Sequence, residues 1–503
     1  MPRRPTLATL LTLAVLGLLA APAQAATHIV QLRDGVSLAD GAAAVRAAHG
    51  EVTGRLPIIR GLAVDLPAHA RSRLAQDPRV ATVSANAPVR SLRRPPLEEM
   101  LGDRLDTAYP WSVLAPQSWD RATGRGVGVA VIDTGIDGSL PDFDGDDGGS
   151  RVVASVVTNP DATTAADTYG HGTHVAGIIA GDGNQRGPGD PADGKYVGIA
   201  PRADLIAIKA ADDEGRGTIL DAIYGLQFVV DHQAEYNIRV VNLSLSSTEP
   251  GSYLTDPLDA AVEAAYFHGI VVVAAAGNRG DDGDAVAYAP GNDPFAISVG
   301  AVDDQGTSDR SDDAFTDWSS TGRTQDGFEK PDLAAPGAHI VSTLARDSAF
   351  AELCPSCVVD GDYIRVGGTS MAAPVVSGVA ALLLELHPEW TPDEVKSTLI
   401  ETARDLDGGV DEVNALAALD AAEPATGANA GVAPSELLDP ATGELDPTRS
   451  SWGRSSWGAA PEDLIAGWAR SSWGCTCPGG STGGLESTRS SWGSAAWLAR
   501  WDF

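Results

Sequence analysis

Short apolar runs alternate with amphipathic segments along residues 105–422. The runs are rich in Val, Ile and Ala, which is typical of strands that are buried on both faces. They lie at 127–132, 204–208, 240–245, 270–275 and 296–299. Segments with helical periodicity separate or follow them, at 218–232, 257–268, 370–386 and 392–402. Strands that alternate with helices predict an α/β fold, with a parallel sheet flanked by helices.

Two of the predicted helices differ in how much of their surface is apolar. In 218–232 one face gathers the apolar side chains Ile219, Ala222, Ile223, Leu226 and Val230, as expected for a helix that covers a sheet. The segment 370–386 is almost wholly apolar and rich in small residues. It is therefore predicted to be buried on all sides.

The first 25 residues show a third pattern. A positively charged start precedes an apolar stretch at 7–21, which is too short to span a bilayer as a stable helix. The sequence Ala23-Gln24-Ala25 fits a small-x-small cleavage site, so we expect residues 1–25 to be a signal peptide. We expect a secreted chain, extracellular or associated with the cell envelope, with no membrane span in its mature form.

Residues 26–95 form a separate small unit that combines strand-like and helical segments. Apolar runs at 28–32, 62–64 and 80–83 predict strands, and an Ala-rich stretch at 38–49 predicts a helix. The sequence Arg93-Arg94-Pro95-Pro96 is typical of an exposed linker to the larger region at 105–422.

Residues 423–503 change to a composition rich in Gly, Ser and Pro without periodicity, which predicts a disordered tail. The tail repeats the pentapeptide Arg-Ser-Ser-Trp-Gly at 449–453, 454–458, 470–474 and 489–493, with a spacing too irregular for a solenoid. An exposed Trp offers a large amphipathic contact surface. The alternative to a plain spacer is therefore a segment that contacts the cell surface or a carbohydrate.

Charge and cysteine content limit the partners. The net charge of -33 excludes nucleic acid and anionic membranes as natural partners. An exported chain sees an oxidising compartment, so its four cysteines can form disulfides, in any of three pairings. Two local bridges, 354–357 and 475–477, are the simplest case, and a zinc site is disfavoured because the CxC spacing is unusual for zinc. The cysteines are Cys354, Cys357, Cys475 and Cys477.

Three segments carry candidate chemistry. In 131–137 an apolar strand ends at Asp133, and in 170–177 His171 opens a helix between two glycines. In 367–374 Ser370 begins the buried helix after a Gly-rich turn, where free N–H groups favour an oxyanion. A metal site at His171 and His174 is disfavoured because no Glu lies between them. The chain order Asp, His, Ser is one of the orders in which a catalytic triad occurs.

These three segments resemble the Asp, His and Ser motifs of the subtilisin-like serine peptidases (subtilases) almost letter for letter. A fourth segment, 271–278, resembles the same family, and its Asn278 aligns with the side-chain donor of the oxyanion hole. The resemblance covers roughly residues 105–422. Residues 26–95 resemble the family's N-terminal propeptide less specifically, and the tail lies outside the resemblance.

The resemblance implies a serine endopeptidase that acts on protein or peptide substrates as a monomer and needs no cofactor for its chemistry. Ser370 is the expected nucleophile and His171 its base, with Asp133 orienting the imidazole. Asn278 and the Ser370 N–H would hold the oxyanion. Residues 26–95 would assist folding, inhibit the enzyme and be removed by self-processing. The alternative class, a catalytically silent binding protein, usually lacks a triad residue, and none is missing here.

The resemblance also implies a substrate cleft. Segment 241–247 is similar to the strand that pairs with the substrate backbone, and 215–217 is similar to the strand that faces it. Ser246 stands where the family usually has Gly, and its Cβ is expected to narrow the S1 entrance unless it is simply tolerated. Ala287 or Tyr288 lies near the S1 floor. The expected substrate-binding residues are Gly215, Gly217, Ser244, Leu245, Ser246, Ala275, Ala276 and Gly277.

Structural calcium is the one metal that the resemblance implies. Asp142 aligns with a calcium ligand of many relatives and begins the acidic segment 142–147. A solvated acidic loop explains the same residues, and the spacing is not that of an EF-hand. The segment 181–195, where relatives often place their other calcium ligands, is longer here and rich in Gly and Pro, which weakens the calcium interpretation.

Overall fold

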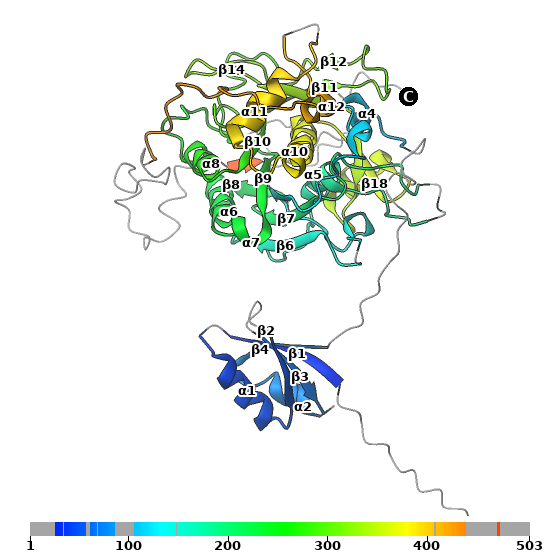
Figure 1. The fold of residues 1–503 in the computed structure, drawn as a ribbon, viewed down its shortest axis with the longest axis vertical. Helices are drawn as coiled ribbons and strands as arrows, with labels where there is room; N and C mark the ends of the chain where they lie inside the picture. Colours follow the sequence, from blue (N-terminus) through cyan, green and yellow to red (C-terminus); the bar gives the residue numbers. More distant parts are fainter. Residues whose placement is uncertain are drawn as a thin grey trace, which may run out of the picture. The chain divides into compact units, whose positions relative to one another are not determined.

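The computed structural model of the 503-residue chain describes residues 26–438 and a short strand at 470–472. Residues 34, 57–60, 68, 86–104, 147, 189, 191 and 407–408 are gaps within this range. The described residues form two compact units, which divide between residues 90 and 91 (Figure 1). Each unit has a hydrophobic core of its own.

The smaller unit is a four-stranded antiparallel sheet, in the order β2-β3-β1-β4, with two helices. Val30 and Val64 of the sheet are buried together with Ala44 and Val45 of the first helix. The Ser37 side chain caps that helix by accepting the N–H of Asp40. The elements are β1 (Ala26–Leu32), α1 (Leu38–Ala47), β2 (Glu51–Leu56), β3 (Gly61–Leu66), α2 (Ala70–Leu74) and β4 (Val80–Ala85).

The larger unit is built on an eight-stranded sheet in the order β12-β11-β10-β9-β5-β7-β6, with β15 also paired to β11. All pairs are parallel except β11 with β12. The strands are β5 (Gly128–Asp133), β6 (Val152–Val157), β7 (Asp204–Lys209), β9 (Ile238–Leu243), β10 (Val271–Ala275), β11 (Ile297–Asp303), β12 (Ala314–Phe315) and β15 (Leu333–Pro336).

Helices cover both faces of this sheet (Figure 1). Successive side chains of a strand point to opposite faces, so Val129 and Val131 of β5 join one core while Ala130 and Ile132 join the other. The first core contains α5 (His171–Ala180) and α10 (Thr369–Leu386). The second contains α6 (Ile219–Asp231) and α8 (Pro257–Phe267).

Shorter elements complete the unit. The helices are α4 (Tyr109–Ser112), α7 (Gln233–Tyr236), α9 (Ala349–Leu353), α11 (Pro392–Glu401) and α12 (Ala415–Leu419). The 3-10 helices are η3 (Pro116–Ser118), η4 (Pro141–Phe143) and η5 (Pro355–Cys357). The strands are β8 (Arg216–Thr218), β13 (Gly322–Arg323), β14 (Glu329–Lys330), β16 (Ile340–Thr343), β17 (Val358–Val359), β18 (Tyr363–Val366) and β19 (Arg470–Ser472).

The predicted fold class is confirmed: a mainly parallel sheet lies between two layers of helices. All five strands predicted in this region are present, with ends that differ by a few residues. The edge strand β6 was not predicted, although its sequence VVASVV is mostly apolar; its residues alternate between partly exposed and exposed, as expected at the edge of a sheet. The apolar segment predicted to be buried is α10, of which all residues from Thr369 to Leu384 are buried.

One predicted boundary needs correction. Residues 423–438 were assigned to a disordered tail, yet they contact the larger unit through hydrogen bonds. The N–H groups of Gly427 and Asn429 donate to the Asp393 carboxylate, and the N–H of Ser435 donates to Glu263. The packed part of the chain therefore extends to Leu438, which is itself buried. Within the tail, only 470–472 is described beyond that residue.

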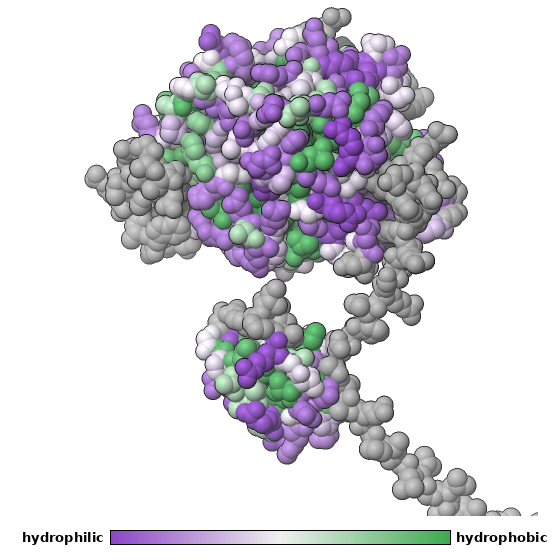
Figure 2. Space-filling model, viewed as in Figure 1, coloured by the Kyte–Doolittle hydropathy of each residue, from purple (hydrophilic) through white to green (hydrophobic). Residues whose placement is uncertain are grey.

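The surface of the larger unit is mostly hydrophilic. Figure 2 shows hydrophilic residues over much of its visible face, with hydrophobic residues in small groups among them. In the described part of the chain, α10 is the only helix long and apolar enough to cross a membrane, and 89% of that stretch is buried within the core.

A group of buried carboxyls lies between α8 and the segment before β11. Asp259 and Glu263 on α8 and Asp293 are all fully buried. Burial raises the pKa of Glu263 to about 9, and the charge of Asp293 adds to the shift. Burial likewise raises the pKa of Asp293 to about 7, which Lys330 and Lys396 oppose. These acids are therefore accommodated more easily with a proton than without one.

We predict that Glu263→Gln makes the unfolding temperature less sensitive to alkaline pH. A raised folded-state pKa stabilises the fold below the unfolded value, and this stability is lost as the pH rises through about 9. Gln does not titrate and keeps an oxygen for the Ser435 N–H. The unfolding temperature of the variant should gain at least ~4 °C over that of its parent between pH 5 and pH 9.

The exposed Glu401 provides the matched control. The difference in unfolding temperature between Glu401→Gln and its parent should be the same at pH 5 and at pH 9. A Glu263→Gln effect that is equal at pH 5 and pH 9 would contradict the assignment of a raised pKa.

Candidate active site

The structure brings the predicted Asp and His together at the carboxyl edge of the sheet. Asp133 is the last residue of β5 and His171 is the first residue of α5. Nδ1 of His171 lies 2.7 Å from Oδ1 and 2.9 Å from Oδ2 of Asp133, and both side chains are fully buried. Because a carboxylate only accepts, Nδ1 carries the proton and donates it. This contact leaves Nε2 as the ring nitrogen that can serve as a base.

Burial and pairing have opposite effects on the pKa of Asp133. Burial raises the pKa of the Asp133 carboxyl, because taking a charge out of water is costly. The neighbouring imidazole and the N–H of Thr134, which donates to Oδ1 at 2.7 Å, oppose that shift. The negative form of Asp133 is therefore held by the groups that face it rather than by solvent.

Asp167 fixes the helix that carries His171, and the sequence did not single it out. Its Oδ1 accepts the N–H of Gly170 and the Thr134 hydroxyl, at 2.7 and 2.8 Å. Its Oδ2 accepts the N–H and the hydroxyl of Thr173. A carboxylate at a helix N-terminus satisfies free N–H groups and suits the helix dipole. Asp167 thereby ties the first turn of α5 to the end of β5.

Gly172 permits the close approach of α5 to β5. A Cβ at this position would lie 2.1 Å from the carbonyl oxygen of Gly135 and 3.1 Å from Cβ of Asp133. Any side chain here would therefore push His171 away from Asp133. Of the two glycines that flank His171 in the sequence motif, Gly172 is thus explained by the close packing of α5 against β5.

Ser370 lies in the first turn of α10, which packs against α5. Its hydroxyl donates to the Ser244 carbonyl oxygen at 3.3 Å, and the Ser244 hydroxyl donates to the Ser370 carbonyl at 2.8 Å. The predicted substrate-pairing segment is thus held directly against the predicted nucleophile. Hydrogen bonds at a catalytic serine are often loose without substrate, so its rotation toward Nε2 is compatible with this arrangement.

Asn278 is anchored to the same turn through its oxygen. Oδ1 accepts both the N–H and the hydroxyl of Thr369, at 2.9 and 3.0 Å. Thr369 Oγ1 in turn accepts the N–H of Gly277 at 3.1 Å. The Nδ2 amide lies 3.5 Å from the position that a Cβ on Gly368 would take, at the start of α10. Two kinds of donor, a side-chain amide and helix N–H groups, therefore meet near Ser370.

The other predicted substrate residues lie on segments around this turn. Ala275 ends β10, and Ala276 and Gly277 lead from it to Asn278. Ser244–Ser246 follows β9, and Leu245 packs into the core. Gly217 lies in β8, with Gly215 directly before that strand. Gly215 has φ of +77°, and a Cβ there would meet the Tyr169 ring at 2.8 Å.

Tyr288 lies beside the continuation of the Ser244–Ser246 segment. The N–H of Ser247 donates to the Ala289 carbonyl, and Pro250 pairs with Tyr288. The Arg279 guanidinium lies 3.8 Å from the centroid of the Tyr288 ring, and the Tyr288 hydroxyl donates to Asp284. Because Arg279 follows Asn278, this contact connects the Tyr288 ring to the segment that continues from Asn278.

The side chains of His174 and Asp142 are both buried and both take part in hydrogen bonds. His174 Nε2 lies 3.0 and 3.2 Å from the carbonyls of Ile364 and Ile340 and must donate to them. Burial lowers its pKa to about 3, so the ring stays neutral. Both oxygens of the buried Asp142 accept hydroxyl protons, from Thr343 and Tyr363. No group of three or more His, Cys, Asp or Glu side chains in the described residues is arranged to hold a metal ion.

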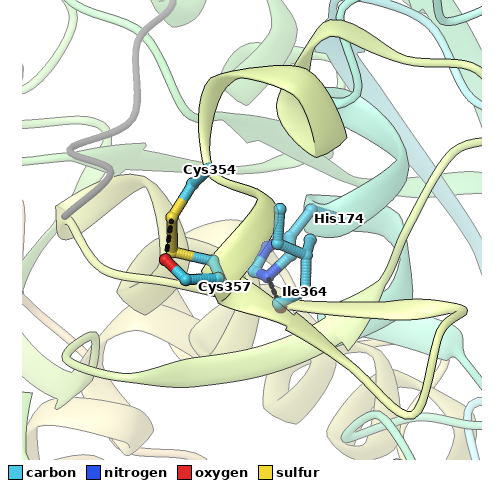
Figure 3. Close-up of a disulfide and its surroundings, with 5 residues drawn as sticks. His174, Cys354, Cys357 and Ile364 are labelled. Atoms are coloured by element: carbon cyan, nitrogen blue, oxygen red, sulfur yellow. Dashed lines mark hydrogen bonds between the residues drawn. A yellow bond between two sulfur atoms is a disulfide. The ribbon is translucent and has the colours of Figure 1, made fainter. Parts of the chain in front are cut away.

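Cys354 and Cys357 form the disulfide that their spacing suggested (Figure 3). The bridge closes the loop between α9 and β17, and both cysteines are buried. Figure 3 draws the bridge together with His174 and its hydrogen bond to Ile364. Cys475 and Cys477 lie outside the described residues.

Comparison with known proteins agrees with this geometry. A model of the subtilase family matches residues 124–418. "Serine protease AprX" of Bacillus subtilis (strain 168) is 39% identical over 282 residues, which are 55% of this chain and 61% of that protein. "Subtilisin E" of the same strain is 34% identical over 360 residues, which are 70% of this chain and 78% of that protein. The chain thus spans less than two thirds of the first relative and more than three quarters of the second.

A solved structure is also similar. The crystal structure of fervidolysin from Fervidobacterium pennivorans, described as a keratinolytic enzyme related to subtilisin, aligns with a TM-score of 0.49 and 27% sequence identity. The alignment covers 80% of this chain and 61% of that one.

The anchoring of Asn278 leads to a prediction with two variants. Asn278→Ala removes the Nδ2 donor and should lower kcat by ~10²–10³, the known cost of removing one oxyanion-hole donor from a subtilisin, with little change in KM. Asn278→Asp keeps the oxygen that Thr369 contacts but places a negative charge against the oxyanion, so its kcat should be lower still. Steady-state hydrolysis of a peptide substrate measures both.

The Asp variant separates the two roles of Asn278. Recovery of activity in Asn278→Asp relative to Asn278→Ala would show that Asn278 acts by holding Thr369 rather than by donating to the oxyanion.

Proposed function

Because the chain belongs to the subtilase family, whose members are serine-type endopeptidases, we propose that it hydrolyses peptide bonds with Asp133, His171 and Ser370 as its catalytic triad. The observation that carries this proposal is the buried contact of His171 Nδ1 with both oxygens of Asp133. It fixes the proton on Nδ1 and leaves Nε2 as base, on a helix that packs against the one carrying Ser370.

The proposed reaction has two halves. Nε2 of His171 takes the Ser370 proton as Oγ attacks the scissile carbonyl, and the imidazolium then gives that proton to the leaving amine. Water repeats the attack on the acyl-enzyme and regenerates Ser370. Asn278 Nδ2 and the N–H groups at the start of α10 would hold the negative oxygen in both halves. Asp133 stabilises the imidazolium without taking its proton.

An extended peptide would bind as an additional strand. Backbone pairing with β8 on one side and with the Ser244–Ser246 segment on the other would place it across the start of α10. Tyr288 would shorten the S1 pocket from below, and Ser246 would narrow its entrance. Catalysis in this family needs no cofactor, so the proposed reaction requires no metal ion. Structural calcium at Asp142 stays a prediction.

We further propose that the protein is made as a secreted precursor. Residues 1–25 would direct export, and residues 26–95, most of which belong to the separate smaller unit, would assist folding and inhibit the enzyme until their removal. The Cys354–Cys357 bridge is compatible with an oxidising compartment. A fold with many non-local parallel pairs is slow to form, which gives an attached folding assistant a physical purpose.

We predict that a fluorophosphonate probe labels mature protein at Ser370. The reaction requires a serine activated by a base, so labelling should be lost in Ser370→Ala and strongly reduced in His171→Ala. Mass spectrometry of the labelled peptide identifies the site. Mature protein that folds, yet neither labels nor cleaves a peptide library, would favour the alternative of a catalytically silent binding protein.

We predict that the precursor processes itself. Ser370→Ala, expressed alone, should keep residues 26–95 attached, while the unchanged chain should lose them. N-terminal sequencing and intact mass measure the outcome. If Ser370→Ala lost residues 26–95 normally in a host without related proteases, self-processing would be excluded. That result would leave the peptidase activity proposed for the unchanged mature chain untouched.

A further inference from the structure

A short segment of the repeat tail forms a strand on the proposed substrate cleft. β19, the first three residues of the third Arg-Ser-Ser-Trp-Gly repeat, pairs antiparallel with β8. Arg470 lies opposite Thr218, Ser471 opposite Gly217 and Ser472 opposite Arg216. In Figure 1 the orange-red strand lies beside β8 on the larger unit. The contact is made by backbone and joins segments more than 250 residues apart.

The two edges of β8 explain why this contact matters. One edge is already used within the unit: Gly217 pairs with Ala211, and the N–H of Asp212 donates to the Arg216 carbonyl at 2.8 Å. A strand has only two edges, so a single edge is left for any further strand. β19 takes that edge, which is the one that an extended substrate would need. Tail and substrate therefore exclude each other.

The register of β19 gives its direction along β8. The strand runs from Thr218 toward Arg216, and the residue of the chain before Arg216 is Gly215. A Cβ on Gly215 would meet the Tyr169 ring at 2.8 Å. Tyr169 contacts Phe350, whose ring centroid is 6.0 Å from that of His171. The end of β8 toward which β19 runs is thus connected to His171 through aromatic contacts.

The sequence of the tail suits repeated binding to this edge. The pentapeptide occurs four times, and each copy begins with Arg and contains no acidic residue, in a chain whose net charge is -33. Attraction between the repeats and the acidic unit adds to backbone pairing and weakens with salt. A tethered segment also has an effective concentration that reaches the millimolar range for short flexible linkers, and four copies raise it further.

We propose that the Arg-Ser-Ser-Trp-Gly repeats are intramolecular ligands of the free edge of β8, which occupy the cleft in competition with peptide substrates. The competition between repeats and substrate rests on the proposed function. The contact between β19 and β8 does not. The repeats thereby raise the substrate concentration that the enzyme needs, and an extended peptide at high concentration displaces them.

The test uses two full-length variants that differ only in backbone N–H groups. In one, both serines of every repeat become proline; in the other, the same serines become alanine. Alternate residues of an antiparallel strand donate to the partner, so one serine of each pair must supply an N–H that proline lacks. Alanine removes the hydroxyls but keeps every N–H, and is the matched control. The positions are Ser450, Ser451, Ser455, Ser456, Ser471, Ser472, Ser490 and Ser491.

The first measurement does not depend on activity. In full-length Ser370→Ala protein, hydrogen–deuterium exchange of the Gly217 amide should be at least several-fold faster in the proline variant than in the alanine variant. The other two β8 amides, of Arg216 and Thr218, donate to Asp212 and Asp221 and should exchange equally in both variants. Equal exchange of the Gly217 amide in the two variants would overturn the proposal. A protein without peptidase activity would still show this difference in exchange. A failure of the proposed function can therefore be told apart from a failure of the proposed contact between tail and β8.

The second measurement uses the active chain. The proline variant should show an apparent KM for a peptide substrate several-fold lower than that of the alanine variant, with the same kcat. Equal KM values in the two variants, or a KM difference that disappears on dilution, would overturn the proposal, because an intramolecular ligand competes at every protein concentration.

Discussion

The arrangement of β5 and α5 in the larger unit depends on the contact between Asp133 and His171. A carboxylate that is fully buried is costly, and removing its partner from such a pair destabilises a protein by ~3–5 kcal/mol. The fold must therefore deliver the imidazole of His171 to within hydrogen-bonding distance of both carboxylate oxygens. It does so by ending β5 at the carboxylate and beginning α5 at the imidazole.

Two further requirements follow from that delivery. The helix must come so close that Gly172 has no room for a side chain, and its first turn must be held in place by Asp167. At the other side of the site, Thr369 links Asn278 and Gly277 to the start of α10. Asn278 and Ser370, the proposed oxyanion donor and nucleophile, are thus connected through one hydrogen-bonded turn, so a change at Thr369 would disturb both together.

The sequence predicted what depends on local pattern. Buried strands and helices follow from periodicity, and Asp133, His171, Ser370 and Asn278 stand in short motifs that can be recognised without a structure. Asp167 has no such signal: it lies in a loop without periodicity, and its role depends on Thr134, a residue 33 positions away. A polar residue four positions before a helix that begins with His was the only available hint.

Two expectations relied on alignment and composition. Asp142 aligns with a calcium ligand of relatives, and that assignment stays a prediction; in the structure Tyr363 and Thr343, more than 200 residues later, donate hydroxyl protons to its two oxygens. Residues 423–438 have the composition of a linker, yet their backbone N–H groups donate to Asp393 and Glu263. Composition does not reveal these contacts, because they are made by the backbone and depend on carboxylates in other segments.

The regulatory role proposed for β8 likewise depends on contacts of the backbone. Because β19 pairs with β8 through its backbone, the proposed competition between tail and substrate for this edge does not require one particular side-chain sequence. Which of them occupies the edge is decided by effective concentration and not by side-chain fit alone. A tail attached to the enzyme always has an advantage over dilute substrates, and abundant substrate removes that advantage. Broad backbone recognition, which allows an endopeptidase to accept many sequences, is thus the property that makes its own repeats effective competitors.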